Sequence, residues 1–340
     1  MIKKTMFFIP LASLFVLVCY FNINSDNKKQ IKMENEQLTY NLLDKDNKPQ
    51  PALSELLEVF EIKHDGTLKN IVEVTQKNWL RTPGKERWEV EEIKTENKDK
   101  AISLIEKLGC IKEIKPTTLI NDFSKTNTKE VEIDFLIAGA TIGRILTRTA
   151  YAIKTYNELT EHFKKLGMKF KVRNLIFLGS ERQRDTKIEG DEMFTTSHPS
   201  FPTKSGWKFD DKFPQTENEM CKFAFNKAEF PKEFLDNTNI IFVSAAMQKN
   251  PDGTLRRANT GDTIEELKSE LKRRNLTLTR SLLFSNNPYI GYQDSVIRTF
   301  SPNDFIVETI GDAGSANEKL SIYLDTIARW LYQEKIRRKA

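Results

Sequence analysis

The second half of the chain alternates between short apolar segments and amphipathic segments, and this alternation constrains the fold more than any other feature. The apolar segments have the length of strands, and the segments between them have helical spacing. Their residues are apolar at consecutive positions, which is typical of parallel strands that helices cover on both faces. The predicted strands are Val131–Ala140, Val172–Ser180, Asn239–Ala245, Arg280–Asn286 and Asp304–Gly311. The pattern predicts an α/β fold with an open, mostly parallel, five-stranded Rossmann-like sheet, spanning residues 129–340.

Helical patterns fill the spaces between these strands. The longest runs from Arg144 to Gly167, where the glycine is a stop signal. Another begins at Thr216, which has capping-box spacing with Glu219. Three more helices are predicted over 260–274, 291–300 and about 317–335.

Residues 51–128 predict a small, mainly helical N-terminal region. Helical spacing occurs at Pro51–Ile62 and again at Asp99–Leu108, where Gly109 follows as a stop. The segment Gly66–Thr75 alternates weakly, so we expect a strand there. Trp79 and Trp88 flank a Pro-Gly turn, and core packing is the better explanation than ligand stacking.

The first 25 residues have the order of a secretory signal. MIKK is cationic, TMFFIPLASLFVLVCYFNI is apolar, and NSDNKKQ is polar. The apolar run also approaches the length that spans a bilayer, so a cleaved signal peptide and an N-terminal membrane anchor are both open. Residues 26–50 predict a polar tether. A cleaved signal peptide would release the body of the chain into the periplasm. An anchor would hold it at the membrane, facing the periplasmic or extracellular side.

Composition argues against several kinds of partner and site. The formal net charge is +5, and no basic stripe interleaves with aromatic residues, so we expect no nucleic-acid partner. His64, His162 and His198 show no metal-ligand spacing, so no metal site is predicted. Cys110 and Cys221 are expected to be buried free thiols. The sequence identifies no cofactor.

The loops that follow the predicted strands carry the candidate site. In open α/β sheets the ligand lies beyond the carboxyl ends of the strands, at the point where the strand order reverses. Glycine lets backbone amides approach a ligand, and arginine holds anions through paired donors. The candidate ligand-binding residues are Gly139, Thr141, Arg144, Gly179, Ser180, Arg182, Arg184, Asn259, Thr260, Thr263, Ser285, Asn286 and Tyr289. They predict a phosphate- or carboxylate-bearing ligand.

Carboxylates in the same loops are the candidates for acid–base chemistry. Glu181, Glu217 and Asp262 lie near arginines or helix starts, where charge and burial tune a carboxyl group. No phosphate loop of the G-x-x-x-x-G-K-[ST] type and no G-x-S-x-G elbow occurs, and GATIGR lacks the dinucleotide fingerprint. The long polar segment 185–215, which holds His198 and Trp207, is expected to be a lid, a hairpin or a binding loop.

The order of these motifs resembles the SanA/ElyC/YdcF-like domain of unknown function. A strand ends in small residues, a helix begins near an arginine, a second strand ends in Gly-Ser, and an E-x-E-M helix start and a strand before a Pro-Tyr loop follow. The resemblance covers roughly Ile133–Phe300, about half of the chain. Matched by position, it implies site roles for Glu217 with Glu219, for Arg257, Asn259, Thr260 and Thr263, and for Arg144 or Arg148.

The resemblance also implies a setting for the protein. The family is Rossmann-like and includes bacterial envelope proteins, so we expect an exported, envelope-associated protein that binds a phosphorylated or nucleotide-like ligand or an envelope precursor. Hydrolase or transferase activity is one expectation. Family members tend to have a histidine and an arginine in the loop after the fourth strand, where this chain has Tyr289, Tyr292 and Gln293. A non-catalytic binding or scaffold protein is therefore the alternative.

Overall fold

The computed structural model describes residues 40–82, 85, 89–196, 201–301, 305–315 and 317–339. The predicted signal or anchor, most of the predicted tether, Trp88 and His198 lie outside these residues. Residues from 39 onward form one structural unit. Among the described residues, no helix is both long enough and apolar enough to cross a membrane.

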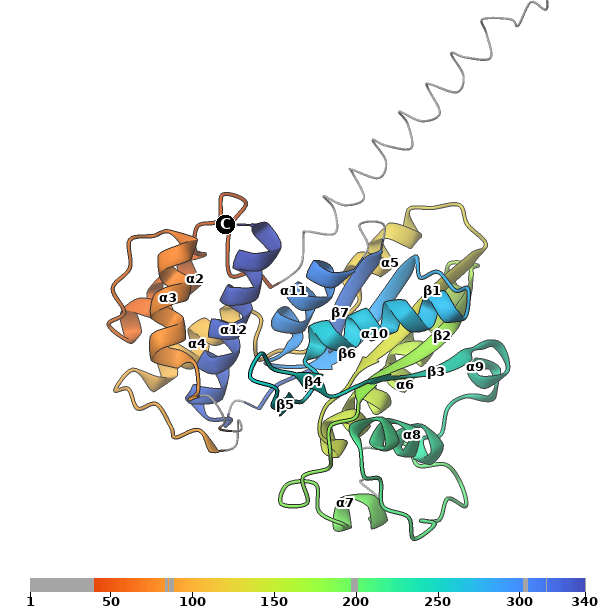
Figure 1. Ribbon diagram of the computed structural model, residues 1–340. Coiled ribbons are helices and arrows are strands. Elements are labelled where there is room, and N and C mark those ends of the chain that lie inside the picture. The colour runs from red at the N-terminus through yellow and green to blue at the C-terminus, as the bar shows by residue number, and fades with distance from the viewer. Residues whose placement is uncertain are drawn as a thin grey trace, which may run out of the picture. The chain divides into compact units, whose positions relative to one another are not determined.

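The centre of the fold is a parallel sheet in the order β3-β2-β1-β6-β7 (Figure 1). Its strands are β1 (Glu130–Ala138), β2 (Lys169–Ser180), β3 (Asn239–Ala245), β6 (Arg280–Asn286) and β7 (Ile306–Asp312). The chain adds strands outward from β1 to β3 and then crosses back, so that β6 pairs with the other side of β1. The predicted five-stranded Rossmann-like sheet is confirmed, and its order reverses between β1 and β6.

Helices pack around this sheet, as predicted. The connections hold α6 (Ile142–Lys165), α8 (Glu217–Lys227), α9 (Lys232–Asn237), α10 (Thr260–Arg273) and α11 (Ile290–Phe300). The first three pack against β1, β2 or β3, and α10 and α11 lie next to each other. A two-strand ribbon, β4 (Gln248–Lys249) with β5 (Leu255–Arg256), precedes α10.

The two faces of the sheet have different cores, because successive strand residues point to opposite sides. Leu136 faces an aliphatic cluster that includes Ile176 and Val243 with Ile264 of α10. The neighbouring Phe135 contacts Phe284, with ring centroids 4.7 Å apart, and also Phe234 of α9. Burial on both sides explains why the strands are apolar at consecutive positions.

The N-terminal region is helical and packs on the end of the chain. It holds α2 (Pro51–Val59), α3 (Leu68–Trp79), α4 (Lys98–Lys107) and α5 (Thr117–Ser124). Helix α3 packs against α12 (Leu320–Arg338), where Gln76 Nε2 donates a hydrogen bond to the Ala328 carbonyl. Tyr40, in the segment predicted as tether, is buried and meets the ring of Trp330 edge-on.

The strand predicted over Gly66–Thr75 is wrong, because this segment belongs to α3. Thr67 caps the helix by accepting a hydrogen bond from the Asn70 amide. Ile71, Val72 and Thr75 are then buried at helical spacing, and the helix continues to Trp79, which is also buried. Packing of this face against α12 outweighs the weak alternation that suggested a strand.

Candidate functional site

A small cavity lies at the carboxyl-terminal edge of the sheet, next to the position where the strand order reverses. Its volume is ≈ 70 Å³. Residues of β1, β2 and β6, the first residue of α8, the start of α10 with the turn before it, and one residue of α11 contribute to it. The lining residues are Ala138, Gly139, Leu178, Glu217, Ala258, Asn259, Thr260, Thr263, Ile264, Leu283 and Gln293. The structure therefore brings Gly139, Glu217, Asn259, Thr260 and Thr263 together, as the loop argument requires.

Glu217 is the carboxylate of this cavity. It is the first residue of α8, whose start is fixed by the predicted capping box between Thr216 and Glu219. Its side chain is 13% exposed and accepts a hydrogen bond from Ser180 Oγ at 2.5 Å. Burial raises the pKa of Glu217, although the nearby Arg182 and the Ser180 hydrogen bond act to lower it. The group is thus held closer to its neutral form than an exposed glutamate.

Gly139 lets the backbone pass directly beside this carboxyl group. A Cβ at position 139 would lie 2.4 Å from the Leu178 carbonyl oxygen and 2.9 Å from Glu217 Cδ. Neither separation is tolerable, so a side chain here would displace both the strand pairing and the cavity wall. The glycine predicted from its place after the first strand is required by close approach.

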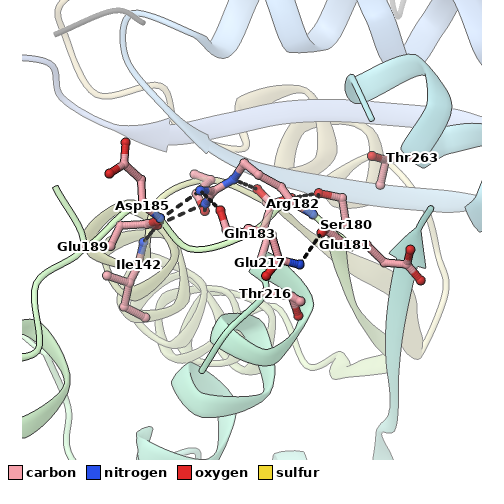
Figure 2. A network of polar contacts seen from close by, with 12 residues as sticks. Ile142, Ser180, Glu181, Arg182, Gln183, Asp185, Glu189, Thr216, Glu217 and Thr263 are labelled. Carbon is pink, nitrogen blue, oxygen red and sulfur yellow. Dashed lines mark hydrogen bonds and ion pairs between the residues drawn. The ribbon is translucent and has the colours of Figure 1, made fainter. Parts of the chain in front are cut away.

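Arg182 joins the loop after β2 to a second buried carboxylate. Its Nη1 and Nη2 donate to Glu189 Oε2 and Oε1 at 2.9 and 3.0 Å, and its Nε lies 3.9 Å from Glu217 Oε1 (Figure 2). Glu189 is fully buried and also accepts hydrogen bonds from the amides of Ile142 and Asp185. The first amide of α6 therefore binds a carboxylate of the chain itself.

A second arginine, Arg148 of α6, is buried beneath the same edge. Its Nη1 donates to the carbonyls of Ala138 and Gly139 at 2.6 and 2.7 Å, and its Nε donates to Asn286 Oδ1 at 3.0 Å. The guanidinium thus ties the end of β1 to the end of β6, and its charge acts on Glu217. The resemblance left Arg144 and Arg148 open, and Arg148 is the one placed below the cavity.

The turn before α10 forms the opposite wall. Asn259 caps the helix through a capping box with Asp262, whose amide donates to Asn259 Oδ1. Asp262 also receives Arg256 Nη1 and Nη2 at 2.6 and 3.1 Å, and although burial acts to raise its pKa, these bonds leave the pKa lowered. The carboxylate of Asp262 is therefore engaged in capping and in an ion pair, whereas Thr260 and Thr263 line the cavity.

The loop after β6 supports the site from the side of α11. Ser285 is buried and donates a hydrogen bond to Gln293, which lines the cavity. Tyr289 is also buried, and the guanidinium of Arg144 lies over its ring, 4.4 Å from the centroid. Arg144 and Tyr289 thus form a cation–π pair and are not among the residues that line the cavity.

Four other predicted residues lie outside the cavity lining. Glu181 is exposed and points away from the Arg182–Glu189 pair (Figure 2). Arg184 donates to Asp191 at 2.6 Å and lies over the ring of Phe194. Gly179 packs its backbone against Asn218 of α8, and Thr141 is the N-cap residue of α6, without a capping hydrogen bond from its side chain.

Sequence reasoning missed Glu189 altogether. This residue belongs to the long segment after β2, which contains the short helix α7 (Glu192–Thr195) and bridges back to the body at Gln183–Thr216 and Thr203–Ala228. An acidic residue in a polar segment gives no signal of full burial. Gln293 was noted only as a departure from the family pattern.

The described residues include no group of three or more His, Cys, Asp or Glu side chains placed to hold a metal ion. Cys110 and Cys221 are buried and free, as predicted. Burial raises the pKa of the Cys110 thiol to about 12 and that of Cys221 well above its ordinary value, so both stay protonated.

No protein-family model matches the chain, and no curated protein matches it either.

Proposed function

We propose that this chain is an exported, envelope-associated protein of the SanA/ElyC/YdcF-like type, which binds a phosphorylated or nucleotide-like ligand at the carboxyl-terminal edge of its sheet. The observation that carries the proposal is the shared cavity. Glu217 of α8 and Thr260 and Thr263 of α10 line one small space, with Arg182 and Arg148 close to the carboxylate. Such a convergence of polar side chains is typical of a ligand site.

The size of the cavity limits what enters it. Pockets that enclose a drug-sized ligand measure about 300–1,000 Å³, whereas this one measures ≈ 70 Å³. One phosphate or carboxylate group is the appropriate occupant, and the remainder of a larger ligand would lie outside. The start of α10 adds a favourable potential for negative charge there.

Glu217 is the residue that fits acid–base chemistry. A carboxyl group with a raised pKa can donate a proton to a phosphoryl or leaving-group oxygen, and solvent then reprotonates the carboxylate. Of the three predicted acid–base residues, Glu217 lines the cavity, Glu181 is exposed and Asp262 is bound by Arg256. If the protein is an enzyme that hydrolyses or transfers a phosphoryl group, Glu217 is the proposed general acid.

A non-catalytic envelope binding protein is the second candidate. It is favoured by the loop after β6, where the family pattern has a histidine and an arginine. In this chain the cavity instead receives the amide of Gln293, which is hydrogen-bonded to Ser285. An amide orients a ligand but carries no proton through a reaction.

Thermal-shift and calorimetric titrations with inorganic phosphate, AMP, ATP and a short prenyl phosphate test the proposal, because a ligand of the folded state raises its apparent stability. Ala258→Phe would fill the cavity from its half-buried wall and should abolish binding. Binding that survives this substitution, or no binding by the unmodified chain, refutes the proposal.

Two further variants separate the candidate functions. Glu217→Gln should retain binding and abolish turnover if the protein is an enzyme, while Glu181→Gln, a change of the same kind at an exposed position, should alter neither. Binding without turnover in the unmodified chain supports the binding protein.

A further inference from the structure

Arg182 lies between two largely buried carboxylates and binds them unequally. Both terminal nitrogens of its guanidinium donate to Glu189, at 2.9 and 3.0 Å. Its Nε lies 3.9 Å from Glu217 Oε1, which is too long for a hydrogen bond. The bidentate geometry, which is the strong form of this interaction, therefore belongs to Glu189.

Glu189 is itself held by backbone groups from two sides (Figure 2). Its Oε1 accepts the Ile142 amide at 3.0 Å and its Oε2 accepts the Asp185 amide at 2.8 Å. Arg182 Nη2 donates in addition to the Ala140 carbonyl at 3.1 Å. These contacts fix the orientation of the guanidinium relative to α6.

We propose that Glu189 is a positioning residue for Glu217: it holds the Arg182 guanidinium in a bidentate pair, so that the carboxyl group in the cavity keeps no bidentate cation partner and can carry a proton. The inference rests on the proposed role of Glu217 as the proton-bearing group of the site. Glu189 does not touch the cavity and acts through Arg182.

Of the cations near Glu217, Arg182 is the one whose orientation Glu189 fixes. Arg148 faces Glu217 from α6, and it donates hydrogen bonds to the carbonyls of Ala138 and Gly139 and to the side chain of Asn286. Cys221, on the same helix as Glu217, remains a neutral thiol. Removing the charge of Glu189 frees the guanidinium fork to turn toward the carboxylate that its Nε already approaches.

The test follows the protonation of Glu217 directly in the full chain. The carboxyl carbon of Glu217 is observed by ¹³C NMR, assigned by its loss in Glu217→Gln, and titrated with pH. In Glu189→Gln we expect the midpoint to fall by about 1 pH unit, because a close arginine lowers a carboxyl pKa by about 1–3 units and part of that effect is already present at the Nε–Oε1 separation of 3.9 Å. Asp191→Asn removes a carboxylate from the same segment, one that pairs with Arg184 instead, and should leave the midpoint unchanged.

A double variant separates positioning from the direct effect of the Glu189 charge. In the Arg182→Gln background no guanidinium is present to turn, so adding Glu189→Gln should lower the midpoint by less than it does in the unmodified chain, because only the direct effect of the Glu189 charge remains. If Glu189→Gln lowers the midpoint equally in the two backgrounds, or leaves it unchanged in the unmodified chain, the positioning role is refuted. Should Glu189→Gln not fold, Glu189→Asp takes its place. It shortens the side chain that holds the bidentate pair, so the midpoint should also fall, and an unchanged midpoint counts against the role.

The titration needs no ligand. Absence of phosphate binding by the unmodified chain would refute the proposed function and leave this measurement valid, while an unchanged midpoint would refute the positioning role alone.

Discussion

Glu189→Ala should cost more stability than any other single change at the site. The substitution leaves Arg182 with a buried charge, since the arginine side chain is 13% exposed and Glu189 is fully buried. Removing one partner of a buried pair costs about 3–5 kcal/mol. The amides of Ile142 and Asp185 lose their acceptor as well, and losing the acceptor at a helix start adds about 0.5–2 kcal/mol.

The free energy of unfolding of the variant should thus fall by about 3.5–7 kcal/mol, the sum of these two ranges. Urea unfolding followed by circular dichroism measures it, with the midpoint and the slope fitted separately. Replacing both partners, as in Arg182→Gln with Glu189→Gln, should cost less than Glu189→Ala, because no buried charge is left unpaired. A loss below about 1 kcal/mol in Glu189→Ala, the value of an exposed pair, would refute this reasoning.

Three other predictions concern the same region. Glu217→Gln and the unmodified chain should have the same free energy of unfolding at low pH, and the variant should have the higher one near neutrality. Because burial raises the pKa of Glu217, the native state of the unmodified chain loses stability as pH rises from the unfolded-state pKa through the higher folded-state pKa. A difference that is constant from pH 3 to 8 would contradict this. Thr216→Ala should cost about 0.5–2 kcal/mol through loss of the α8 cap, measured by urea unfolding beside Thr195→Ala, an exposed threonine of α7 that should cost less. Gly139→Ala should lower both the melting temperature and ligand affinity, since its Cβ would meet the Leu178 carbonyl oxygen; wild-type values of both would show that the cavity wall can yield.

The sheet could be predicted from the sequence because burial on both faces leaves a simple mark. The strands at Asn239–Ala245 and Arg280–Asn286 occur at the predicted bounds. The α8 cap could also be predicted, since Thr216 and Glu219 interact over only three residues. Gly66–Thr75 was not recognised as a helix, because the face it buries is defined by α12, more than two hundred residues away.

The position of the candidate site could be predicted in part, because it follows from the parallel sheet. Residues that follow a strand must lie at one edge of a parallel sheet, and the cavity that Gly139 and Thr263 line is at this edge. The sequence does not show which carboxylate is buried. Glu217 meets Ser180, 37 positions away in the chain, whereas Asp262 meets Arg256, only 6 positions away, and the local residue types do not distinguish the two outcomes.

The central claim is that distant loops form one site for an anionic group at the edge of the sheet. Amide chemical shifts of the full chain, followed by TROSY NMR during titration with inorganic phosphate and then AMP, test it most directly. We predict saturable shifts that are largest at Gly139, Glu217, Thr260 and Thr263 and that disappear in Ala258→Phe. Shifts confined to other surfaces, or none at millimolar concentrations of either compound, would contradict it.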